Sequence, residues 1–171
     1  MPQLVILRGN SGSGKSTAAK CLQEKLGRGT LLVSRDMVRI QMLHVYGGQD
    51  ALSVDLIGQL LRFGSQNCAV TILEGILRAD AYGALFRQLP EWFPDQIYSY
   101  YFDIPFAETL RRHAQKPNSH EFGETQMRGW FRSYEDDRID GLPETIIHQT
   151  QSTEEIAARI AADLAENGEC T

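Results

Sequence analysis

A glycine-rich stretch near the start of the chain has the residue types and the spacing that bind phosphate groups. Residues 8–17 read RGNSGSGKST and contain the pattern Gly-x-x-x-x-Gly-Lys-Ser. Glycines let successive backbone N–H groups turn toward phosphate oxygens, the lysine adds a mobile positive charge, and the serine hydroxyl can bind Mg²⁺. In a chain of 171 residues the pattern arises by chance on the order of 1% of the time. A dinucleotide-binding Gly-x-Gly-x-x-Gly pattern does not fit, because position 17 is threonine.

The sequence therefore predicts a phosphate-binding loop between a strand and a helix. Its expected ligand is ATP together with Mg²⁺, since this type of loop surrounds the phosphates of a nucleoside triphosphate. A glycine-rich turn without a ligand is the alternative. The residues expected to bind the nucleotide are Gly9, Asn10, Ser11, Gly12, Ser13, Gly14, Lys15, Ser16 and Thr17.

A second group of reactive side chains follows the apolar run GTLLVSRD at residues 29–36. Ligands of an open α/β sheet bind beyond the carboxyl ends of its strands, so Asp36 is expected to face the same crevice as the loop. A carboxylate there can accept the proton of an attacking hydroxyl, and Arg39, one helical turn later, can reach the same acceptor molecule. Alternatively, Asp36 caps a helix that begins at Met37, and both roles can coexist.

Glu74 ends a third apolar run, CAVTILEG, at residues 68–75. Its carboxylate can join Ser16 in holding Mg²⁺, directly or through water, because hard cations prefer oxygen ligands. Two alternatives stay open: Glu74 can bind the hydroxyls of an acceptor, or it can serve as an ordinary loop carboxylate.

The elements that must position these side chains alternate along the chain. Strands are expected at residues 3–9, 29–36, 68–75, 96–104 and 144–150. Helices are expected at residues 15–27, 37–47, 50–64, 78–90, 105–117, 124–138 and 152–168. Near-continuous apolar strands that alternate with helices are typical of a parallel sheet covered on both faces. The expected fold is α/β, in three layers around a five-stranded parallel sheet, with residues 1–171 in a single domain.

The stretch RGNSGSGKST…LLVSRDMVRIQML resembles the P-loop kinases that phosphorylate hydroxyl groups, and YYFDIPFAETLRRHAQKP resembles their fourth strand and the arginine-bearing lid that follows it. Within this group, the chain is similar to phage-type polynucleotide kinases and to small bacterial kinases labelled zeta-toxin-like, uridine kinase or AAA-type ATPase. The resemblance implies a P-loop NTPase fold like that of nucleoside-monophosphate kinases, with a short lid at about residues 112–127.

The same resemblance implies roles for individual residues in transferring the γ-phosphoryl group of ATP. Lys15 contacts the phosphates, Asp36 acts as the base, and Arg39 holds the acceptor. A lid arginine, Arg112 or Arg128, neutralises the transferred group.

The net charge of −5 argues against a protein that grips long nucleic acid mainly through its phosphates. The favoured acceptor is therefore the hydroxyl of a small molecule such as a nucleoside, a metabolite or an antibiotic. A polynucleotide 5′-hydroxyl is the second choice, and a nucleotide sugar, as for zeta-toxin-like kinases, is the third. A regulatory NTPase and a nucleotide-binding module without catalysis are the remaining alternatives.

The chain has no apolar stretch near the ~20 residues that cross a bilayer, and MPQLVILRGN is not typical of a secretion signal. Cys21, Cys68 and Cys170 lack the paired spacing of metal ligands. We therefore expect a cytoplasmic protein with reduced thiols and no membrane contact, present as a monomer or homodimer.

Overall fold

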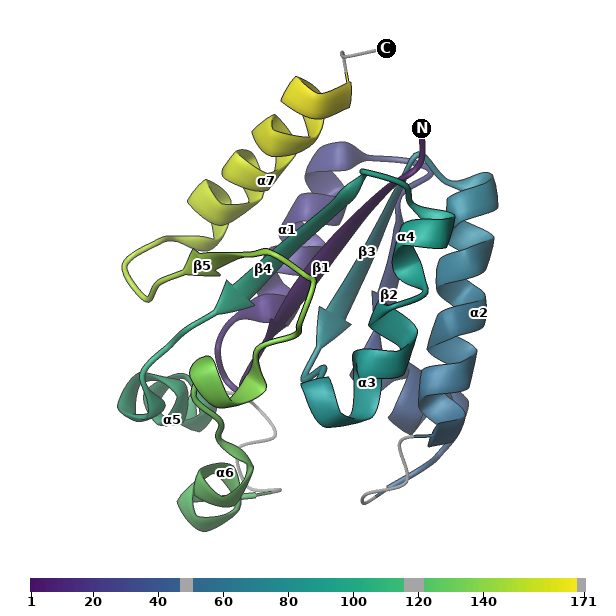
Figure 1. Cartoon of the computed structure of the whole chain (residues 1–171). Helices are drawn as coiled ribbons and strands as arrows, with labels where there is room; N and C mark the ends of the chain where they lie inside the picture. The colour runs from purple at the N-terminus through teal and green to yellow at the C-terminus, as the bar shows by residue number, and fades with distance from the viewer. Residues whose placement is uncertain (47–50, 116–121, 169–171) are drawn as a thin grey trace.

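A computed structural model of the chain describes residues 1–46, 51–115 and 122–168. Its centre is a five-stranded sheet in the order β2-β3-β1-β4-β5, with every neighbouring pair parallel (Figure 1). The strands are β1 (Gln3–Gly9), β2 (Leu31–Ser34), β3 (Val70–Gly75), β4 (Ile97–Phe102) and β5 (Glu144–Ile147). This architecture confirms the α/β fold expected from the sequence.

Helices cover both faces of the sheet, because side chains alternate between the two faces along each strand. On β1, Val5 and Leu7 belong to one core cluster, whereas Leu4 and Ile6 belong to the other. The first cluster lies beneath α1 (Lys15–Leu26) and α7 (Thr153–Gly168). The second lies beneath α2 (Ala51–Asn67), α3 (Ala79–Phe86) and α4 (Leu89–Trp92) (Figure 1). Within the described residues, no helix has the length and apolar character to cross a membrane.

Three expected helices are shorter or divided in the structure, and the one expected at 78–90 divides into α3 and α4. The helix expected at 37–47 is a single π-helical element, η1 (Met37–Met42), and His44 just beyond it has the left-handed φ of 54° that interrupts a helix. Residues 47–50 lie outside the described part of the chain.

The helix expected at 124–138 divides into α6 (Glu124–Trp130) and the 3₁₀ turn η2 (Glu135–Asp137). Phe131 is extended, with ψ of 135°, and the N–H of Arg132 donates to the side chain of Asn10 instead of continuing the helix. Together with α5 (Phe106–Ala114), α6 lies below the carboxyl end of the sheet (Figure 1).

A buried ionic cluster fixes the segment after α6 to the sheet. The Arg8 side chain is completely buried at the end of β1, where its Nε donates to Glu144 at 2.8 Å and its Nη1 to the Leu77 carbonyl at 2.7 Å. Arg8 also donates to the main-chain and side-chain oxygens of Asp137. Burial raises the pKa of both Asp137 and Glu144, because removal from water disfavours a charged carboxylate and the nearby Arg8 offsets only part of this effect.

Candidate active site

The strand order brings together three chain segments that are distant in sequence. Because β3 lies between β1 and β2, Glu74 near its end is in register with Leu7 on one side and Ser34 on the other. The glycine-rich loop leaves β1 and the Arg35-Asp36 pair leaves β2 at the same edge of the sheet. The carboxyl ends of these strands therefore lie at one edge of the sheet, where the predicted site residues are gathered.

The loop has the backbone shape that phosphate binding requires. Gly12 and Gly14 have φ angles of 76° and 99°, which disfavour side chains. A Cβ on Gly12 would also lie 2.5 Å from the Thr109 carbonyl oxygen of α5. Gly14 precedes α1 directly, so the free N–H groups of the helix's first turn belong to the loop, where they favour an anion.

Lys15 is held inside this loop, with only 6% of its surface exposed. Its Nζ donates to the Asn10 carbonyl at 2.7 Å and to Ser13 Oγ at 3.3 Å. The ammonium group is thus already positioned among the backbone atoms that would surround a phosphate, as its predicted role requires.

Glu74 joins the phosphate loop to the end of β2. Its carboxylate, 4% exposed, accepts from Ser16 Oγ at 2.9 Å and from Ser34 Oγ at 2.5 Å. A hydroxyl beside a carboxylate fits Mg²⁺, which binds few protein oxygens and takes its other ligands from phosphates and water. The described residues hold no cluster of three or more His, Cys, Asp or Glu that could bind a metal without such help. Ser16 and Glu74 therefore remain the predicted magnesium residues.

Asp36 is exposed at the mouth of the site and is oriented by its neighbour. Its side chain is 62% accessible and accepts from Arg35 Nη1 at 3.3 Å. Arg35 is buried, and its Nε donates to the hydroxyl of Tyr82 at 3.1 Å. A Cβ on Gly75 would lie 2.6 Å from Arg35 Cβ, so the glycine makes room for this arginine. The Asp36 side chain makes no capping hydrogen bond to η1, which favours the predicted role as a base.

The three predicted arginines differ in where they lie. Arg39 is half-buried within η1, one turn after Asp36. Arg112 contacts the phosphate loop, because its Nη1 donates to the Ser13 carbonyl at 3.0 Å while its Nε donates to Glu108 at 2.6 Å. Arg128 is 66% exposed, pairs with Glu124 at 2.6 Å and lies over the ring of Phe106. Its described contacts thus do not include the loop.

Part of the lid expected at about 112–127 falls on residues 116–121, which lie outside the described residues. The described portion includes the start of α6, and the chain just after α6 contacts the phosphate loop. Asn10 accepts from the Arg132 N–H at 2.9 Å and donates to the Arg132 carbonyl at 2.7 Å. The sequence pattern did not identify this contact, and the only available signal was that Asn10 is a polar residue inside the motif.

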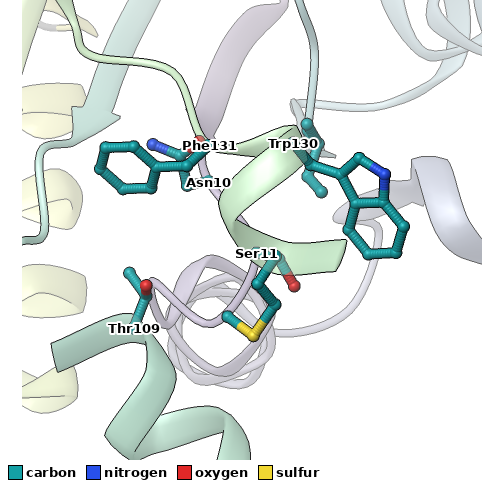
Figure 2. A pocket seen from close by; sticks show the side chains of 7 residues that line it. Asn10, Ser11, Thr109, Trp130 and Phe131 are labelled. Carbon is teal, nitrogen blue, oxygen red and sulfur yellow. The ribbon is translucent and has the colours of Figure 1, made fainter. Parts of the chain in front are cut away.

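A small pocket of about 10 Å³ lies between α6 and the loop. Asn10, Ser11, Thr109, Trp130 and Phe131 line it, and Figure 2 shows the two aromatic rings pointing to opposite sides of α6. Its volume suits about one water molecule. The pocket is therefore a junction between α6 and the loop rather than a site for a substrate.

Among solved structures, this chain is similar in fold to several small-molecule kinases. A shikimate kinase from Acinetobacter baumannii in complex with shikimate has a TM-score of 0.64 and 17% identity, over 100% of this chain and 97% of the other. A gluconokinase from Sinorhizobium meliloti 1021 has a TM-score of 0.63 and 15% identity, over 98% and 94%. The chain has the fold of the P-loop kinases.

The APS kinase of Mycobacterium tuberculosis, in complex with AMPPNP and APS, has a TM-score of 0.61 and 21% identity, over 96% of this chain and 98% of that one. No family model matches the sequence, and no curated protein matches it. The P-loop kinase fold therefore extends over nearly the whole chain. Identities this low show the shared fold and do not show a shared substrate.

Proposed function

We propose that this protein is an ATP-dependent phosphotransferase that moves the γ-phosphoryl group of ATP to a hydroxyl of a small molecule. The observation that carries the proposal is the position of Asp36. An exposed carboxylate, oriented by a buried arginine, lies at the same sheet edge as a loop built for phosphates. A carboxylate at this edge suits an acceptor hydroxyl, which must give up its proton as it takes the phosphoryl group.

Each residue of the site has a defined task in this reaction. The loop amides and Lys15 bind and orient the phosphates of the donor, and Arg112 holds the loop in shape through the Ser13 carbonyl. Ser16 and Glu74 would hold Mg²⁺, which supplies neutralisation of phosphate charge when bound. Asp36 accepts the proton of the acceptor hydroxyl, and Arg39 lies one turn away to contact the acceptor.

A small acceptor is supported by the charge of the protein and by the kinds of protein that share its fold. The net charge of −5 provides little attraction for a polynucleotide. Three of the similar solved structures are kinases of shikimate, gluconate and APS by name. A polynucleotide 5′-hydroxyl, a nucleotide sugar and a regulatory NTPase remain the alternatives, and an acceptor assay separates them.

The test is transfer of label from γ-³²P-ATP in the presence of Mg²⁺. The protein is incubated with a small-molecule extract, with a nucleotide-sugar mixture, or with an oligonucleotide that has a free 5′-hydroxyl. Label in a small molecule supports the proposal, and label confined to the oligonucleotide or the nucleotide sugars supports those alternatives. Fast hydrolysis that no acceptor changes would contradict a kinase. Lys15→Ala is the control, because it removes the charge that holds the phosphates and should abolish transfer.

A further inference from the structure

The side chain of Asn10 joins two parts of the chain that are 122 residues apart. Its carboxamide oxygen accepts from the N–H of Arg132, and its NH₂ group donates to the carbonyl of the same residue. Both bonds go to main-chain atoms, so they fix the backbone of residue 132 whatever its side chain does. A side-chain amide with both of its polar ends paired to one residue defines distance and orientation together.

This pair lies where α6 (Glu124–Trp130) ends and the chain returns toward the sheet. Phe131 takes an extended conformation, and its ring packs on Phe106 at 5.4 Å between centroids. From α5, the Thr109 carbonyl is so close to Gly12 that a Cβ there would be 2.5 Å from it. The phosphate loop is therefore in contact with both α5 and the chain that follows α6.

The guanidinium group of Arg132 lies at the carboxyl end of α6. Its Nη1 donates to the carbonyls of Phe131 at 3.0 Å and Gly129 at 3.4 Å, and the residue is half-buried. Arg128, by comparison, is 66% exposed and neutralised by Glu124. Of these two arginines of the α6 region, the one whose backbone is attached to the phosphate loop is Arg132.

We propose that Asn10 is a positioning residue that attaches the end of α6 to the phosphate loop and thereby sets Arg132, rather than Arg128, beside the transferred phosphoryl group. The catalytic part of this inference rests on the proposed function. The structural part, the attachment itself, is independent of it. A cation fixed beside the loop stabilises the charge that develops during phosphoryl transfer, whereas one on a free helix must first be ordered.

Hydrogen exchange of the nucleotide-free protein tests the attachment. Asn10→Ala should reduce the protection of the Arg132 N–H by about tenfold to thirtyfold, the expected effect of losing two hydrogen bonds. Residues 153–168 of α7 should be unchanged. Asn10→Asp retains the acceptor for the Arg132 N–H and loses the donor to the Arg132 carbonyl. Its protection of the Arg132 N–H should therefore lie between those of the wild type and Asn10→Ala. The matched control is Asn67→Ala, because Asn67 also donates from its side chain to a backbone carbonyl, that of Phe63, far from the site. Unchanged protection in Asn10→Ala, or an equal effect of Asn67→Ala, would overturn the attachment.

A double-mutant cycle on ATP turnover, with water or an identified hydroxyl as acceptor, tests the catalytic part. Arg132→Ala keeps the main-chain attachment and should lower kcat by ~10²-fold. Asn10→Ala should lower kcat by about tenfold with KM for ATP changed less than about threefold, and Arg128→Ala should have a smaller effect than either. The double variant should be no slower than Arg132→Ala, because Asn10 acts through that residue. Losses that multiply, or a larger loss in Arg128→Ala, would overturn the assignment. A wild-type protein without turnover would contradict the proposed function, while the exchange result would still decide the attachment.

Discussion

The contact of Glu74 with Ser16 leads to a quantitative prediction about magnesium. Glu74→Gln removes one negative charge and keeps the shape of the side chain. A glutamine can still accept from one serine hydroxyl and donate to the other, so the bridge from Ser16 to Ser34 should survive. The variant should fold like the wild type, and its change in metal dependence should come from charge.

The size of the effect follows from the short distance and from burial. The nearest carboxylate oxygen lies 2.9 Å from Ser16 Oγ, and Glu74 is 4% exposed, so water screens it poorly. Two unit charges 4 Å apart interact by about 4 kcal/mol at an effective dielectric constant near 20. Nucleotide phosphates offset part of the positive charge of Mg²⁺. The remaining attraction between Glu74 and the metal is therefore about 1.5–3 kcal/mol. This corresponds to roughly a 10- to 100-fold loss in the preference for ATP with Mg²⁺ over metal-free ATP.

The assay is fluorescence titration with an ATP analogue, with Mg²⁺ and with EDTA. In Glu74→Gln, metal-free nucleotide should bind more tightly than to the wild type, since the repulsion between carboxylate and phosphate is lost. The ratio of the affinity for nucleotide with Mg²⁺ to the affinity for metal-free nucleotide should fall by roughly 10- to 100-fold. Glu166→Gln on the exposed side of α7 is the matched control for the change in net charge. An unchanged ratio of the two affinities in Glu74→Gln would refute a metal role for this residue.

Two more predictions concern the base and the buried ionic cluster. Asp36→Asn should leave the affinity for ATP within a few-fold and lower transfer by ~10²–10⁴-fold, and transfer at the wild-type rate would remove Asp36 from the mechanism. Burial raises the pKa of Glu144 above its ordinary value of 4.5, so the folded protein binds this proton at a higher pH than the unfolded chain does. The contribution of Glu144 to the free energy of unfolding is therefore full below that value and falls as pH rises through the raised pKa. Urea unfolding at several pH values should show a shallower negative slope in Glu144→Gln, because only the raised pKa of Asp137 then remains, and the same slope in both proteins would contradict the prediction.

The sequence determined the features that depend on neighbouring residues. Gly12 and Gly14 specify a loop whose backbone needs positive φ, and Lys15 starts the helix that follows it. Apolar runs that alternate with helical patterns specify a parallel sheet with both faces covered. Together these local signals predicted the fold, the phosphate loop, and the placement of Asp36 at the same edge.

Tertiary structure decided which distant residues meet at that edge. The position of β3 between β1 and β2 places Glu74 against Ser16 and Ser34, and no pattern within any of the three strands specifies that order. Likewise, helical periodicity continues past Trp130, but the chain leaves the helix there because Asn10 offers Arg132 two hydrogen bonds. Contacts of this kind depend on the free energy of packing the whole chain, so local propensity predicts the elements and the folded core decides which side chains share the site.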